Sequence, residues 1–67
     1  MDREKFPLHS TSDIELAMRL GEEAVELAKE CFKIHRFKDK KAWKKFRAEL
    51  QDVKDCIAEV ERRGLDK

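Results

Sequence analysis

The chain has 67 residues, of which sixteen are Lys or Arg and fifteen are Asp or Glu, so its formal net charge is +1. This length excludes a second domain, and the near balance of charge excludes a general attraction to nucleic acid or to anionic membranes. The chain also has no apolar run near the ~18 residues of a membrane span and no secretory signal at its start. We therefore expect a cytoplasmic protein that makes no membrane contact.

Glycine and proline are scarce, with two glycines and one proline, which favours an all-α fold over closely spaced strands. Residues 1–11 show no sustained period and are predicted to be an extended or short helical lead-in, with Phe6 or Leu8 packed on a neighbour. Residues 12–67 are predicted to form one helical domain.

The first helix is predicted to begin at Ser12, which has Glu15 three residues later and so has the spacing of a capping box. Two apolar stripes follow at helical spacing, and together they are wider than one neighbouring helix would cover. The first stripe contains Leu16, Leu20, Leu27, Cys31 and Ile34, and the second contains Ile14, Met18, Val25 and Phe32. We therefore expect this helix to contact two neighbours.

The second helix is predicted to have Asp39 as its N-cap and to end at Gly64, where a C-cap glycine is expected. Its apolar residues are spaced alternately by three and four, as in a coiled coil. They are Trp43, Phe46, Leu50, Val53, Ile57 and Val60. The short link implies an antiparallel hairpin in which residue numbers at one level sum to about 76.

A bare hairpin of this size would leave the second stripe in water, and small domains without disulfides often need partner subunits or a metal. We therefore expect a homo-oligomeric four-helix bundle, either a homodimer or a homotetramer. Cys31 and Cys56 lie at different levels of the hairpin, too far apart to pair, and are expected to be buried thiols.

Two pairs of acidic residues border the apolar seams of the two helices. Glu23 and Glu26 are three residues apart on the first helix, and Glu49 and Asp52 are three apart on the second. In the expected register all four lie at the same height. Oxygen ligands without His or Cys suit Mg²⁺ or Mn²⁺, although a solvated helix face that makes pairs between neighbouring turns would look similar.

The segment 21–27 (GEEAVEL) and the segment 49–53 (ELQDV) resemble the ExxE…ExxD signature of the all-α nucleoside triphosphate pyrophosphohydrolases. That superfamily includes the MazG-type enzymes, phosphoribosyl-ATP pyrophosphatases and dimeric dUTPases. The link at 32–39 is also similar to that of small MazG-like proteins, and the resemblance spans roughly residues 12–64.

The resemblance implies an Mg²⁺ (or Mn²⁺) site made by Glu23, Glu26, Glu49 and Asp52, where a nucleoside triphosphate is hydrolysed to a monophosphate and pyrophosphate. Glu22 or Glu26 is the expected general base. Family members usually continue past the ExxD helix, whereas this chain ends at Lys67. We therefore expect either that a neighbouring subunit supplies the missing wall or that activity is weak or absent.

Basic residues cluster around the hairpin link, and among them Lys33, Arg36 and Lys45 are candidates to bind the triphosphate tail. The cluster would also suit nucleic acid phosphates, which the balanced net charge makes the less favoured partner, or it is a solubilising helix start. The sequence thus leaves two functions open. One is a metal-dependent nucleotide pyrophosphohydrolase; the other is a non-catalytic helical oligomerisation or regulatory module whose basic link contacts a protein or nucleic acid.

Overall fold

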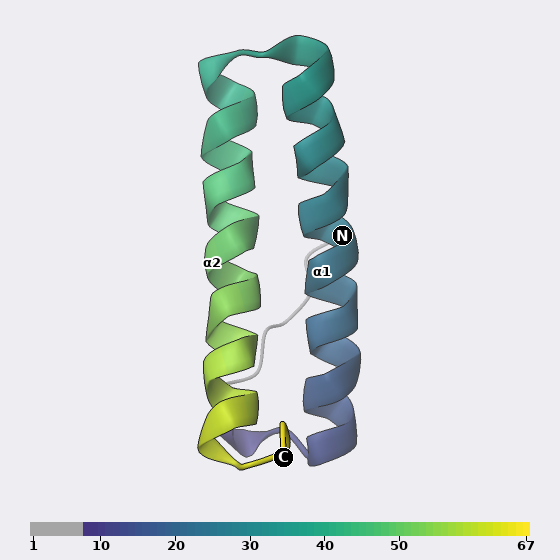
Figure 1. The fold of residues 1–67 in the computed structure, drawn as a ribbon, viewed down its shortest axis with the longest axis vertical. Helices are drawn as coiled ribbons and strands as arrows, with labels where there is room; N and C mark the ends of the chain where they lie inside the picture. The colour runs from purple at the N-terminus through teal and green to yellow at the C-terminus, as the bar shows by residue number, and fades with distance from the viewer. Residues whose placement is uncertain (1–7) are drawn as a thin grey trace.

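The computed structural model describes residues 8–67, and Phe6 lies outside them. It contains a short 3₁₀ helix, η1 (Leu8–Ser10), and two long helices, α1 (Asp13–Phe37) and α2 (Lys40–Arg62). The two long helices lie side by side and run antiparallel (Figure 1). The structure thus confirms the all-α helical hairpin, and residues 8–67 contain no strand.

Side-chain caps start both long helices where the sequence predicts them. Ser12 is the N-cap of α1: its Oγ accepts a hydrogen bond from the Glu15 amide at 3.1 Å, and Glu15 Oε1 accepts one from the Ser12 amide at 3.0 Å. Asp39 caps α2 by accepting a 2.8 Å hydrogen bond from the amide of Ala42. These local bonds satisfy amides that have no partner within their own helix.

Two residues with positive φ end the helices. Lys38 has φ 53° and donates its amide to the carbonyl of Ile34, which closes α1 and reverses the chain before Asp39. Gly64 has φ 72° and follows Arg63, the C-cap of α2. The glycine adopts this conformation without strain, whereas the lysine carries a Cβ penalty there.

The antiparallel register matches the predicted one. Arg63 at the end of α2 reaches Asp13 at the start of α1, and the two numbers sum to 76. The same guanidinium donates a 2.8 Å hydrogen bond to the carbonyl oxygen of Leu8, so it also holds η1 against α2. These contacts close the open end of the hairpin, opposite the link.

The faces that the helices bury differ in part from those predicted. Between the helices lie the buried residues Leu16, Glu23, Glu30, Ala42, Val53, Cys56 and Glu59. Cys56 is buried as expected, but Cys31, Trp43 and Ile57 are exposed, so their predicted place in the seam was wrong. Within residues 8–67 each long helix has one long neighbour, with η1 added beside the end of α2, and the sides of α1 and α2 that face each other are the ones covered.

The hairpin is a single layer of helices, 37 × 29 × 14 Å in extent. Its smallest dimension is close to the diameter of one helix with its side chains, about 10–12 Å. A layer one helix thick has two broad open faces, and this explains why many large apolar side chains remain exposed. Neither α1 nor α2 contains an apolar stretch long enough to cross a lipid bilayer.

Candidate metal centre

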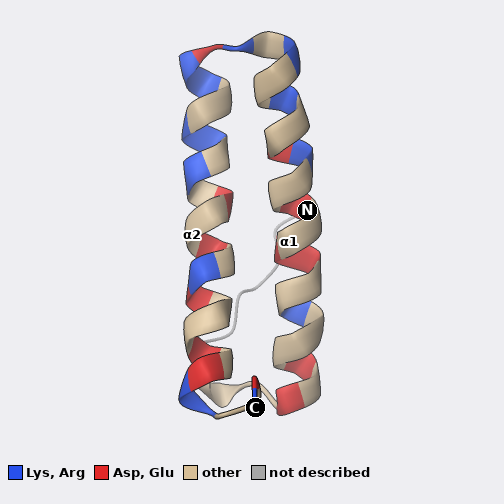
Figure 2. Cartoon of the chain, in the orientation of Figure 1, with Lys and Arg blue, Asp and Glu red and all other residues tan. Residues whose placement is uncertain are grey.

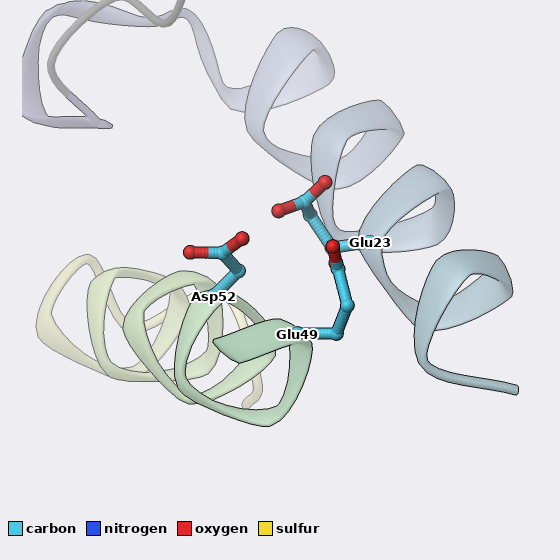
Figure 3. Close-up of side chains that lie close together, drawn as sticks. All are labelled: Glu23, Glu49 and Asp52. Atoms are coloured by element: carbon cyan, nitrogen blue, oxygen red, sulfur yellow. The ribbon is translucent and has the colours of Figure 1, made fainter. Parts of the chain in front are cut away.

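Three of the four predicted carboxylates converge between the helices. Glu23 projects from α1 toward Glu49 and Asp52, which project from α2 (Figure 3). One carboxylate oxygen of each residue lies within 4.8 Å of one such oxygen of the other two. The site is therefore shared between the two long helices.

The antiparallel register produces this convergence. The residue numbers of Glu23 and Asp52 sum to 75, close to the sum of 76 for Asp13 and Arg63 at the open end. Glu23 and Asp52 therefore lie at nearly the same level of the hairpin. Glu49 lies three residues before Asp52 and therefore projects from the same side of α2. A shift of one helical turn between α1 and α2 would separate the carboxylates by about 5.4 Å along the axis.

The site lies at the edge of the seam and is partly withdrawn from water. Glu23 is only 6% exposed, and the Oε2 atoms of Glu23 and Glu49 are both buried. Asp52 is half-buried. In such surroundings closely spaced negative charges repel each other more strongly than in water, which favours a site that receives positive charge.

A buried thiol neighbours the acidic site. Burial raises the pKa of the Cys56 thiol, and the negative charges of Glu23, Asp52 and Asp55 raise the pKa further, whereas Arg19 acts in the opposite direction. The thiol therefore remains protonated at neutral pH. The three donors that the structure gathers are carboxylate oxygens.

The structure places Glu26 and Glu22 beside the cluster but not in it. Glu26 is half-exposed and forms an ion pair with Lys29 at 3.6 Å, and the three-carboxylate group does not include it. Glu22 is exposed. Of the four expected ligands, the structure thus gathers Glu23, Glu49 and Asp52 and turns Glu26 toward a lysine.

The residues at the centre fit a hard divalent cation. Mg²⁺ binds oxygen at about 2.0–2.1 Å in octahedral geometry, so its ligand oxygens lie about 3 Å apart when adjacent and about 4.2 Å apart when opposed. The oxygens of Glu23, Glu49 and Asp52 lie within 4.8 Å of one another, so side-chain rotations would bring them to these separations. Mg²⁺ sites use few carboxylates and leave positions for water and phosphate oxygens.

The three expected phosphate ligands lie toward the link. Lys33 Nζ is 3.3 Å from Glu30 Oε2, and the Arg36 guanidinium lies 6.0 Å from the centroid of the Phe37 ring. Lys45, one turn before Glu49, lines an open pocket of about 230 Å³ together with Lys33. Of the three, Lys45 is nearest in sequence to the carboxylate cluster.

Glu30 is a buried acid that the sequence reasoning did not select. It is 6% exposed, and its Oε1 atom is buried without a hydrogen bond from any residue in the range 8–67. The sequence does indicate that Glu30 is buried. Glu23, Leu27 and Glu30 continue the alternating spacing of four and three residues that starts at Leu16 and Leu20. Acidic residues at two core positions of such a repeat are unusual enough to single them out.

We compared the chain with models of protein families, with curated proteins and with solved structures, and none of the three comparisons found a match.

Proposed function

We propose that the protein is a Mg²⁺-dependent nucleoside triphosphate pyrophosphohydrolase of the MazG-like type, which converts the triphosphate to a monophosphate and pyrophosphate. The proposal is supported above all by the convergence of Glu23, Glu49 and Asp52 from opposed helices. The ExxE and ExxD segments that contain these residues are those whose sequence resembles the superfamily.

In this proposal Glu23, Glu49 and Asp52 hold the cation. Bound there, Mg²⁺ or Mn²⁺ supplies neutralisation of phosphate charge and lowers the pKa of a water molecule. The burial of Glu23 supports this role, because a partly desolvated carboxylate interacts more strongly with a cation than one in bulk water.

The remaining residues have roles that follow from where they lie. Glu22 and Glu26 flank Glu23 on α1 and are exposed or half-exposed, so either carboxylate can accept a proton from water at the edge of the site. Lys45 lies on α2 about 6 Å along the axis from Glu49, where its ammonium would bind a phosphate. Lys33 lies further toward the link and would contact the distal phosphates. Arg36 lies about 15 Å along α1 from Glu26 and is assigned no phosphate.

We also propose that the active form is a homo-oligomer, in which helices from two copies form a four-helix assembly. This is supported by the large apolar side chains exposed on both helices, which include Ile14 and Phe32 on α1 and Trp43 and Ile57 on α2. A second copy would cover such residues.

Calorimetric titration with Mg²⁺ tests the metal site directly. The wild-type chain is expected to bind the ion at millimolar concentration, and Glu23→Gln and Asp52→Asn are expected to weaken binding at least tenfold, since each removes a charged oxygen ligand. Glu61→Gln is the matched control, because Glu61 is an exposed acid near the end of α2. Absence of Mg²⁺ and Mn²⁺ binding in the wild type would reject the proposal.

A pyrophosphate-release assay across ribo- and deoxyribonucleoside triphosphates then tests turnover. We expect release that depends on Mg²⁺ and is lost in Glu23→Gln, whereas Glu61→Gln retains it. Metal binding without turnover on any triphosphate would leave a cation-binding helical module and would contradict the hydrolase.

The second candidate function, a non-catalytic module, is favoured by one observation. Blue bands of Lys and Arg gather at the link end of both helices, especially on the first turns of α2 (Figure 2). Lys40, Lys41 and Lys44 are all exposed there. If this cluster contacts nucleic acid, binding to a labelled duplex or single strand will weaken steeply with salt, and a Lys41→Glu/Lys44→Glu variant will not bind.

A further inference from the structure

Large apolar side chains follow one side of α1 along most of its length. Ile14 and Phe32 are each 75% exposed, Val25 is 56% exposed, and Met18 is also exposed. From Ile14 to Phe32 these residues span about 27 Å at 1.5 Å per residue. Exposed residues scattered singly are normal, whereas an aligned set of this length marks a contact surface.

This side of α1 faces away from α2. Ile14 lies two residues before the buried Leu16, and Phe32 lies two residues after the buried Glu30. Two residues correspond to about 200° around an α-helix, so the exposed side chains lie nearly opposite the side that α2 covers. The hairpin cannot cover them by itself.

The spacing of these residues is that of a helix-pairing seam. Steps of four and three residues alternate along what we call the outer stripe, which consists of Ile14, Met18, Gly21, Val25, Ala28 and Phe32. This is the repeat that packs one helix against another. At Gly21 an added Cβ would meet no atom of residues 8–67 within 4 Å, so the described part of the chain leaves room for another helix to approach closely.

Charged residues flank one edge of the outer stripe at intervals of seven. Glu15 and Glu22 lie in the amino-terminal half of α1, and Lys29 and Arg36 lie in the carboxy-terminal half. All four side chains are exposed. The edge is therefore acidic over one half and basic over the other, which is complementary to a copy of itself turned end to end.

We propose that the outer stripe is the docking surface for a second copy of this chain, with the two α1 helices packed antiparallel about a twofold axis near Val25. In this register Glu22 lies opposite Lys29 of the second copy and Glu15 lies opposite Arg36, because both pairs of numbers sum to 51. Symmetry repeats each pair, so four ion pairs flank the seam.

The same register gives a consistent set of apolar layers. Met18 packs on Phe32 of the second copy, since their numbers sum to 50, and Val25 packs on its own counterpart at the axis. Gly21 lies opposite Ala28, so the two smallest residues of the outer stripe meet where the helices are closest. Apart from Ile14, which lies at the level of Arg36 at the end of the outer stripe, large side chains thus meet large ones or their equals, and a sulfur meets an aromatic ring.

The order of charges also argues against a parallel pair of α1 helices, and the dipole of α1 does not explain it. A parallel pair would place the acidic halves at one level and the basic halves at another, so it would bring no opposite charges together. The dipole of α1 itself favours acids in the first turn and bases in the last, but its effect fades within one turn of each end. Glu22 and Lys29 lie in the middle of α1, so the dipole gives no reason for their order.

A charge swap followed by sedimentation velocity tests the register. We expect the wild type to be dimeric, and Glu22→Lys and Lys29→Glu each to raise the dimer dissociation constant roughly tenfold, because each replaces two ion pairs by two like-charge pairs. The double variant restores opposite charges and is expected to return to the wild-type value. Glu61→Lys and Lys54→Glu carry the same charge changes on α2 and are expected to leave the dimer unchanged.

A second pair of variants tests whether the outer stripe of α1 is the interface, independently of the ion pairs beside it. Val25→Asp places two carboxylates at the twofold axis and is expected to yield a helical monomer, since Val25 is exposed in the hairpin. Ile57→Asp alters the exposed apolar side of α2 and is expected to leave the dimer intact. A dimer that survives Val25→Asp but not Ile57→Asp would overturn the proposal and assign the interface to α2.

This inference rests on the proposed self-association but not on hydrolysis, and the sedimentation experiments distinguish the failures. A wild type that stays monomeric at high micromolar concentration would overturn both self-association and this interface. A dimer that tolerates Glu22→Lys, Lys29→Glu and Val25→Asp would overturn the interface alone. Pyrophosphate release is measured separately and bears only on the hydrolase.

Discussion

Arg63, which follows the last residue of α2, donates a 3.0 Å hydrogen bond from its guanidinium to a carboxylate oxygen of Asp13, the first residue of α1. The same side chain bonds Glu59 at 2.7 Å and the carbonyl oxygen of Leu8 at 2.8 Å. One mostly buried arginine thus joins both long helices and η1 at the end where no covalent link connects the helices.

Arg63→Ala is therefore expected to lower the thermal midpoint of unfolding by several degrees. The change removes charge-assisted hydrogen bonds and leaves Glu59 with one arginine partner instead of two. Arg62→Ala is the matched control, because the structure pairs Arg62 with Glu59 on the same helix. Thermal unfolding followed by circular dichroism measures both, and equal losses in the two variants would contradict a special role for Arg63.

The stability of the hairpin is expected to fall in acid because of Glu59. Hydrogen bonds from Arg62 and Arg63, together with their charges, lower the pKa of this carboxyl from its usual 4.5 to about 2. A group whose pKa is lower in the folded state contributes stability above its unfolded pKa, and the contribution is lost as the pH falls through the folded pKa. The loss is therefore expected between pH 4.5 and pH 2.

Glu59→Gln isolates this effect. The variant is expected to be less stable than the wild type at pH 7, and most of the difference is expected to be lost by pH 2, where the wild-type carboxyl is half protonated. Unfolding midpoints measured from pH 2 to pH 7 for both proteins provide the comparison. A difference that stays constant over this range would show that the charge of Glu59 is not what stabilises the hairpin.

The link predicts a stabilising substitution at Lys38. This residue has φ 53°, a left-handed conformation that glycine adopts more readily than lysine. Lys38→Gly is expected to raise the free energy of unfolding by about 0.5–1 kcal/mol. Lys44→Gly, in the interior of α2, is expected to lower it by about 1 kcal/mol. Urea unfolding of both variants checks the opposite signs.

Glu30 predicts a second stabilising change. It lies in the seam with one buried oxygen that accepts no hydrogen bond from residues 8–67, and a buried charge with incomplete partners is costly. Glu30→Leu continues the apolar repeat of α1 and is expected to stabilise the hairpin by about 1–3 kcal/mol.

Lys33→Ala serves as the control for Glu30, because it removes the 3.3 Å ion pair and keeps the buried carboxylate. The ammonium is half-exposed but the carboxylate is buried, so removing Lys33 leaves a buried charge without this partner, and the variant is expected to be destabilised. Destabilisation by Glu30→Leu would instead show that the carboxylate has a partner that stabilises the folded state.

Much of the hairpin follows from short stretches of sequence. Ser12 with Glu15, and Asp39 with the amides that follow it, start the two helices by hydrogen bonds that span three residues. Such bonds depend only on neighbouring sequence, so their positions are readable without tertiary information. The antiparallel register then follows from the short link and the helix lengths, and Arg63 meets Asp13 as that register requires.

The carboxylate site was only partly predictable, because the sequence gives the level of each residue but not the direction of its side chain. Glu23, Glu49 and Asp52 meet because they share a level and lie near the seam. Glu26 shares that level, but its side chain instead forms an ion pair with Lys29. A difference in direction of about 60° around α1 separates Glu26 from Glu23, and spacing alone does not decide which of the two lies nearer the partner helix.

The sequence by itself determined the two helices, their ends, the link and the level at which each residue lies. Only the tertiary structure decided which side of each helix is covered, since the apolar arc of α1 is wider than one neighbour can bury and α2 buries only part of its predicted seam. Packing therefore selected among apolar faces, leaving Trp43 and Cys31 exposed and enclosing Glu30. That choice depends on the summed contacts of two whole helices, which no local pattern contains.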